Sequence, residues 1–126
     1  MDAACPVVLA LAEDALICGL IEDVLSPQEF TVEITVEPEA ALARVETGTV
    51  SLIILDLGWA EARGLEICGR LRAAPYGART PIIALTESSP AQRDVTGFSV
   101  GPQEYLYKPF HIDDLLAAVA RYCGKR

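Results

Sequence analysis

Three short, uninterrupted apolar runs most constrain the fold of this chain. They lie at residues 7–11, 52–55 and 81–85. An apolar run of this length is typical of a strand that is buried on both faces of a parallel sheet. Behind the first run, apolar residues recur at helical spacing up to Ser26-Pro27, which ends the pattern. The sequence therefore predicts buried strands that alternate with helices.

Two weaker strand patterns and four further helical patterns complete this alternation. Residues 30–36 alternate strictly between apolar and polar side chains, which indicates an edge strand with one wetter face. Residues 105–107 form a last short strand. Besides the first helix, the patterns predict helices at residues 38–48, 65–73, 91–98 and 112–123. Five strand–helix units predict an α/β fold, with a doubly wound parallel sheet and helices on both faces.

Length, charge and cysteine content limit the class of protein. A chain of 126 residues predicts one domain, here residues 1–126. A net charge of −8 without any basic run argues against nucleic acid as a partner. No apolar stretch approaches the roughly 18 residues of a membrane span, so no membrane partner is expected. Four cysteines without a CxxC pair and an N-terminus without a secretion signal indicate free thiols in a cytoplasmic protein.

Polar side chains follow the predicted strands at their carboxyl ends. Glu13 and Asp14 follow the first strand and Asp56 ends the third. Thr86 follows the fourth strand and Lys108 the fifth. In a doubly wound sheet these ends meet at one edge, where such proteins bind ligands. Two or more carboxylates, a hydroxyl and an ammonium group are therefore expected to converge there.

The motifs that carry these residues resemble one known family. Residues 51–56, 81–86 and 105–110 resemble the CheY-like receiver domain of two-component response regulators, and the resemblance covers nearly the whole chain. Thr86 and Lys108 follow Asp56 at 30 and 52 residues, as the family spacing requires. The resemblance implies a flavodoxin-like sheet of five parallel strands in the order 2-1-3-4-5, with five helices.

The resemblance also implies a role for each matching residue. Asp56 would be the phosphoacceptor, which attacks a phosphoryl group carried by a sensor histidine kinase or a phosphotransfer protein. Lys108 would contact the phosphoryl oxygens. The Thr86 hydroxyl would turn inward to bond the phosphoryl group, and Tyr105 would follow it as the second residue of a switch. No turnover of a separate substrate is expected; a dehalogenase-type phosphatase, for example, needs a second aspartate where Gly58 stands.

The metal site departs from the family pattern of two adjacent acids after the first strand, because this chain has Ala12-Glu13-Asp14. With Glu13 in the second acidic position, the following helix turns only apolar residues inward. With Asp14 there, the helix would bury a charged residue. The resemblance then implies that Mg²⁺ is held by Glu13, Asp56 and the backbone carbonyl of Gly58. We expect weak binding, since Ala12 replaces an acid.

Two functions are compatible with these residues. In the first, phosphorylation of Asp56 switches the face formed by residues 91–98, 105–107 and 112–123, which contacts a downstream protein, an output domain outside this chain or a second copy of the chain. In the alternative, a pseudo-receiver acts through protein contacts without phosphorylation. Asp56, Thr86 and Lys108 together favour the first function. Ala12, and Glu87 beside the expected phosphoryl pocket, favour the second.

Overall fold

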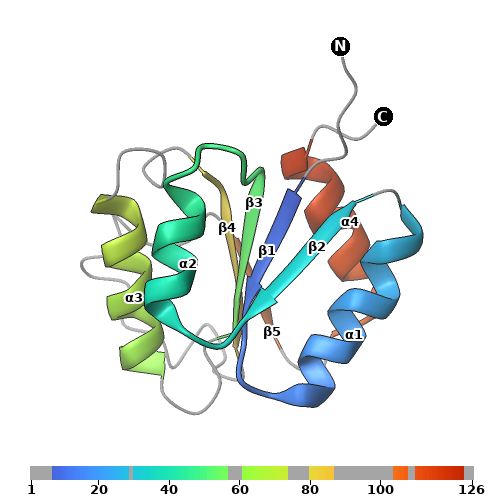
Figure 1. Ribbon diagram of the computed structural model, residues 1–126. Coiled ribbons are helices and arrows are strands. Elements are labelled where there is room, and N and C mark those ends of the chain that lie inside the picture. The colour runs from blue at the N-terminus through green and yellow to red at the C-terminus, as the bar shows by residue number, and fades with distance from the viewer. Residues whose placement is uncertain are drawn as a thin grey trace.

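The computed structural model describes a parallel sheet with helices on both faces (Figure 1). It covers residues 7–28, 30–56, 61–73, 80–86, 104–107 and 110–123. All strand pairs are parallel and the order is β2-β1-β3-β4-β5, as predicted. The strands are β1 (Val7–Leu11), β2 (Thr31–Thr35), β3 (Leu52–Asp56), β4 (Ile82–Thr86) and β5 (Glu104–Tyr107).

Four α-helices are found in the described ranges, two on each face of the sheet (Figure 1). They are α1 (Ala15–Leu25), α2 (Pro38–Val45), α3 (Glu61–Ala73) and α4 (Ile112–Cys123), with a short 3₁₀ turn η1 (Ser26–Gln28) after α1. Helices α1 and α4 cover one face, and α2 and α3 cover the other. Helix α3 begins one turn earlier than the sequence predicts. The helix predicted at residues 91–98 lies outside the described residues.

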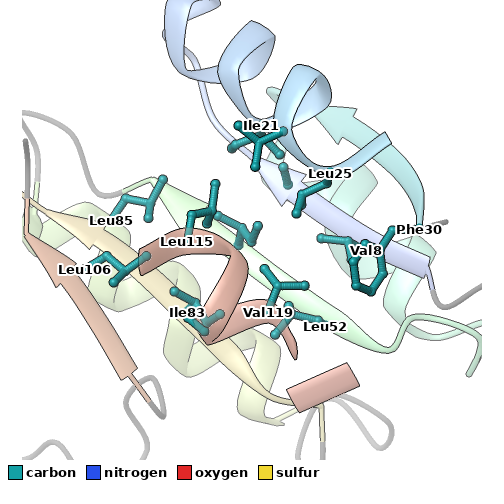
Figure 2. Packing of buried hydrophobic residues seen from close by; sticks show 14 residues of the cluster. Val8, Ile21, Leu25, Phe30, Leu52, Ile83, Leu85, Leu106, Leu115 and Val119 are labelled. Carbon is teal, nitrogen blue, oxygen red and sulfur yellow. The ribbon is translucent and has the colours of Figure 1, made fainter. Parts of the chain in front are cut away.

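Alternate strand residues build two separate cores, because successive side chains of a strand point to opposite faces. The α1–α4 core contains Ile21, Leu115 and Val119 from the helices, packed on strand residues such as Leu52 and Ile83 (Figure 2). The α2–α3 core, on the opposite face, includes Leu9, Ala41, Ile53, Leu71 and Ala84. This double burial explains why the central strands are continuously apolar rather than alternating.

Helix α1 has the orientation that its apolar stripe predicts. Ile21, Val24 and Leu25 are buried in the α1–α4 core, and Ile17 and Leu20 pack against it at the margin. The charged residues of the helix, at positions 22 and 23, are exposed. This confirms the predicted helical phase, whereas the assignment of Glu13 to the second acidic position, which rests on that phase, stays a prediction.

Strand β2 is an edge strand, as predicted, but its polar face is less exposed than strict alternation suggests. Glu33 is half-buried because Arg44 of α2 reaches over it with two hydrogen bonds. Nε donates to Oε1 at 2.5 Å and Nη2 donates to Oε2 at 2.9 Å. Arg44 also donates to the hydroxyls of Thr47 and Thr49, at 2.7 and 2.6 Å. The four side chains join the edge strand to the end of α2.

The sequence predicts free cysteines and no membrane span. Cys18, Cys68 and Cys123 are free thiols, in agreement with the prediction, whereas Cys5 lies outside the described residues. Cys68 is fully buried in the α2–α3 core. Across the described ranges, every helix is too short or too polar to cross a membrane.

Candidate functional site

The candidate site lies at the carboxyl ends of the central strands. Asp56 is the last residue of β3 and lies beside Leu85 of β4, so Thr86 stands one residue beyond it at the end of the neighbouring strand. On the other side, β1 pairs Leu11 with Leu55. Continuing this register places Ala12 level with Asp56. The parallel topology therefore brings the predicted phosphoacceptor and the predicted switch hydroxyl to one edge.

Burial differs sharply among these residues. Thr86 is 0% exposed and Ala12 only 2%, whereas Asp56 is half-buried and Glu13 and Asp14 are exposed. A half-buried carboxylate at a strand end is accessible to a reaction partner but held by its strand. On the β1 side of Asp56, the neighbouring position is thus occupied by the small, buried and uncharged side chain of Ala12.

Cys18 reports the electrostatic character of this edge. Its Sγ donates to the backbone carbonyl of Ala12 at 3.6 Å, which places the thiol beside the end of β1. Burial raises the pKa of the Cys18 thiol, and the negative charges of Asp14, Asp56 and Glu22 raise it further. The carboxylates of Asp14 and Glu22, at the start of and within α1, and that of Asp56, at the end of β3, thus all lie near the Cys18 thiol. The negative potential that they create favours a cation at this edge.

The two acids after β1 have different environments. Asp14 adopts an extended backbone conformation and caps α1, with its Oδ1 accepting a hydrogen bond from the Leu16 amide at 2.9 Å. Glu13 precedes the cap and is exposed. The capping role of Asp14 agrees with the choice of Glu13 as the metal ligand, which itself stays a prediction.

Two of the three predicted metal ligands lie in the described part of the chain. Glu13 and Asp56 are described, and their carboxylate oxygens are ligands that suit Mg²⁺. The third predicted ligand, the carbonyl of Gly58, lies outside the described residues, as do Lys108 and Glu87. Within the described ranges, no group of three or more histidine, cysteine or acidic residues is placed to hold a metal ion.

Two aromatic residues of β5 follow the same sheet face, where Tyr105 pairs with Ala84 and Tyr107 pairs with Thr86. Tyr105 packs against the α2–α3 core, and its hydroxyl oxygen is buried. Tyr107 stacks on it, with 6.3 Å between the ring centroids and 22° between the ring planes. Tyr107 is also the strand partner of Thr86. The sequence pattern did not single out Tyr107 as a site residue, although its spacing of two from Tyr105 puts both rings on one face of the sheet.

A parallel sheet of this order, with a carboxylate at the end of its central strand and a buried threonine at the end of the neighbouring strand, defines a doubly wound α/β domain with a polar site at its strand ends. Comparison with protein families makes the assignment specific. The family model "Response regulator receiver domain" matches residues 8–120. The chain belongs to this family, whose members are signalling domains of two-component systems rather than enzymes that turn over a separate substrate.

Individual relatives agree with this assignment. The response regulator ArlR of Staphylococcus haemolyticus is 34% identical over 112 residues, which is 89% of this chain and 50% of that protein. The phosphate regulon transcriptional regulatory protein PhoB of Rhizobium meliloti is 30% identical over 114 residues, with 90% and 50% covered. The chain thus spans about half the length of the curated relatives it matches.

Solved structures show the same fold. The chemotaxis protein CheY4 of Vibrio cholerae superposes with a TM-score of 0.82 at 27% sequence identity, covering 94% of this chain and 99% of that one. A putative response regulator from Chloroflexus aurantiacus gives the same TM-score at 25% identity, with 96% and 99% covered. The chain is therefore similar to receiver domains over nearly its full length.

Proposed function

We propose that the chain accepts a phosphoryl group on Asp56 from the histidine of a sensor kinase or of a phosphotransfer protein. The observation that carries this proposal is the pairing at the sheet edge: a half-buried carboxylate ends β3, and a fully buried hydroxyl, Thr86, ends the adjacent strand. A carboxylate so placed can be reached by a donor, and a hydroxyl beside it can bond the group that arrives.

The transfer exchanges one covalent bond for another. A carboxylate oxygen of Asp56 attacks the phosphorus as the bond from phosphorus to the donor's imidazole nitrogen breaks, and the imidazole leaves with the electron pair. The Asp56 carboxylate becomes an acyl phosphate. The Thr86 hydroxyl then donates a hydrogen bond to a phosphoryl oxygen. Lys108, which follows β5, supplies a positive charge to the same oxygens.

Mg²⁺ is the cofactor that we propose for this step, held by Glu13, Asp56 and the carbonyl of Gly58. When bound, the ion offsets the negative charge of the carboxylates and of the incoming phosphoryl group. Burial and, after it, the charges of Asp14, Asp56 and Glu22 raise the pKa of the Cys18 thiol, and the proximity of these carboxylates supports a cation at this edge. Because Ala12 contributes no carboxylate, we expect Mg²⁺ to bind more weakly than at a site with two acids after β1.

The response to phosphorylation is proposed to be a population shift. Bonding of Thr86 to the phosphoryl group favours the inward position of Tyr105, and the surface formed by residues 91–98, β5 and α4 changes shape. This surface would contact an output domain or a downstream protein, or a second copy of the chain. The PhoB relative is a transcriptional regulator by name, which makes an output domain outside this chain a reasonable partner. We place the protein in the cytoplasm, where kinase phosphodonors are available.

The alternative function is a pseudo-receiver that acts through protein contacts alone. The observation that favours it is Ala12, which is buried level with Asp56 at the position where the family carries an acid. Without that carboxylate the ion that assists transfer is held by fewer charges. The two functions differ in one measurable property, the capacity of Asp56 to take up a phosphoryl group.

Intact-mass measurement after incubation with Mg²⁺ and acetyl phosphate tests the proposal. We expect one phosphoryl adduct, which is absent from Asp56→Asn and reduced when EDTA replaces Mg²⁺. A folded wild-type protein without an adduct, even at high Mg²⁺ and with a phosphorylated histidine kinase as donor, would favour the pseudo-receiver. Asp14→Asn serves as the matched control, since it removes a neighbouring acid but keeps a side chain that can cap α1.

A further inference from the structure

Strand β5 carries two tyrosines on one face and a leucine on the other. Leu106 points into the α1–α4 core (Figure 2). Tyr105 and Tyr107 therefore lie on the opposite face, because side chains alternate along a strand. Their rings are separated by 6.3 Å between centroids and are inclined by 22°. This is an offset, nearly parallel arrangement within the range in which aromatic pairs attract one another.

Tyr105 occupies an enclosed position. Its ring packs against the α2–α3 core and its hydroxyl oxygen is buried. The residue beside it in β4 is Ala84, which is fully buried and has a small side chain. A ring can lie over an alanine more closely than over a larger strand partner. Two features thus surround the Tyr105 ring on its own sheet face: the small neighbour Ala84 and the stacked ring of Tyr107.

Tyr107 is a neighbour of both predicted switch residues. It stacks on Tyr105, and it is the strand partner of Thr86, which is 0% exposed. Strand partners in adjacent strands project side by side on the same face. The Tyr107 ring is therefore next to the hydroxyl that would bond a phosphoryl group and next to the aromatic ring that would follow it.

We propose that Tyr107 is a positioning residue that holds Tyr105 with its hydroxyl buried. The significance of this role rests on the proposed function, in which Tyr105 changes position when Asp56 is phosphorylated. Removing the Tyr107 ring removes the stacking contact that Tyr105 makes in its buried position, so that position loses stability relative to any other and its population falls. The position of Tyr105 then depends on its neighbour in β5 as well as on Asp56.

Acetylation of tyrosine hydroxyls by N-acetylimidazole, followed residue by residue by peptide mass spectrometry, tests this role. The reaction is carried out on the whole chain without a phosphodonor. We expect Tyr105 to react about fivefold faster in Tyr107→Leu than in the wild type. Loss of one aromatic pair changes the equilibrium between the buried and the exposed position of the Tyr105 hydroxyl by about this factor. Tyr107→Phe, which keeps the ring and loses only the hydroxyl, should protect Tyr105 as the wild type does.

Two results would overturn the proposal. One is equal protection of Tyr105 in the wild type and in Tyr107→Leu. The other is faster reaction of Tyr105 in Tyr107→Phe, which would mean that the ring is not what holds it. An unchanged rate at Tyr122 on α4 shows that a variant is folded, and Tyr107→Ile provides a second variant without a ring. The phosphoryl adduct on Asp56 is measured separately, so failure of the proposed function and failure of this inference are distinguishable.

Discussion

Ala12 occupies a buried position level with Asp56, where it is 2% exposed. A carboxylate placed there would lose much of its hydration and would lie level with the carboxylate of Asp56. We predict that Ala12→Asp lowers the free energy of unfolding in EDTA by about 2 kcal/mol, because a buried polar group without a partner is costly. Mg²⁺ should restore much of this loss, since the new carboxylate is a ligand for it.

Urea unfolding with EDTA and with Mg²⁺ measures both effects. Ala12→Asn is the matched control, because it has nearly the same shape but no charge. The stabilisation by Mg²⁺ should be larger in Ala12→Asp than in Ala12→Asn. Equal stabilisation of the two variants would show that position 12 does not face the ion.

Glu13 and Asp14 are adjacent acids for which we predict separable roles. Asp14 caps α1 through the Leu16 amide, so Asp14→Ala should lower the free energy of unfolding by about 1 kcal/mol and leave Mg²⁺ affinity nearly unchanged. Glu13→Ala should weaken Mg²⁺ binding with little loss of stability in EDTA. Calorimetric Mg²⁺ titration and urea unfolding separate the two roles.

Asp14→Ser is the control for the cap, because serine caps a helix without carrying a charge. It should unfold like the wild type. If Asp14→Ala and Asp14→Ser both lose most of their Mg²⁺ affinity while Glu13→Ala does not, Asp14 is the ligand and the assignment from helical phase is wrong.

At the scale of elements, the contact between β2 and α2 depends on one pair of charges. Arg44 makes two hydrogen bonds to Glu33 and lowers the pKa of that carboxyl group below its usual value of 4.5. A double-mutant cycle with Glu33→Gln and Arg44→Met should give a coupling free energy of about 0.5–1 kcal/mol at pH 7, since the pair is partly exposed.

The same pair should contribute to the pH dependence of stability. A carboxyl group whose pKa is lower in the folded chain stabilises the fold above its unfolded pKa, and this contribution disappears as the pH falls through the folded pKa. The coupling between Glu33 and Arg44 should therefore be constant above about pH 5.5 and decline below 4.5. Unfolding of the four proteins of the cycle at several pH values tests this; a coupling that persists at pH 2.5 would contradict it.

Elements with a clear period were predictable from the sequence, and those that depend on distant partners were not. The continuous apolar runs predicted β1, β3 and β4, and the apolar stripes at helical spacing predicted α1 and α4. Both patterns reflect directly which side chains are buried. The half-burial of Glu33 could not be predicted, since the covering residue, Arg44, lies on another element. The first turn of α3 was missed because residues 61–64 contain no apolar stripe.

The same distinction applies to the site. Topology places Asp56 and Thr86 at one edge, and this was predictable because strand ends in a parallel sheet coincide. The helical phase of α1 was predictable from its apolar stripe, and the assignment of Glu13 as a metal ligand, which rests on this phase, stays a prediction. The stack of Tyr107 on Tyr105 was not predicted, because ring orientation depends on packing rather than on strand period. The assignments of Gly58, Lys108 and Glu87 remain predictions.

For the whole molecule, the two cores and the acidic charge have opposite effects on stability: the cores stabilise the folded sheet and the net negative charge destabilises it. The cores hold the central strands between helices on both faces, so the strand ends are fixed in place. The net charge of −8 disfavours the compact state and attracts cations of any kind. Added Mg²⁺ therefore stabilises the chain both by general screening and by any specific binding at the strand ends.

Comparison of MgCl₂ with NaCl at equal ionic strength separates these two contributions. Screening should stabilise the wild type and Asp56→Asn alike in NaCl. Specific binding in MgCl₂ adds a further increase in the free energy of unfolding, which grows with the logarithm of the ion concentration. This increase is about 2.7 kcal/mol when Mg²⁺ is at 100 times its dissociation constant. We predict this additional stabilisation for the wild type and its loss in Asp56→Asn, measured by urea unfolding. If both proteins gain equally in MgCl₂, the ion acts only on the overall charge and the strand ends hold no specific site.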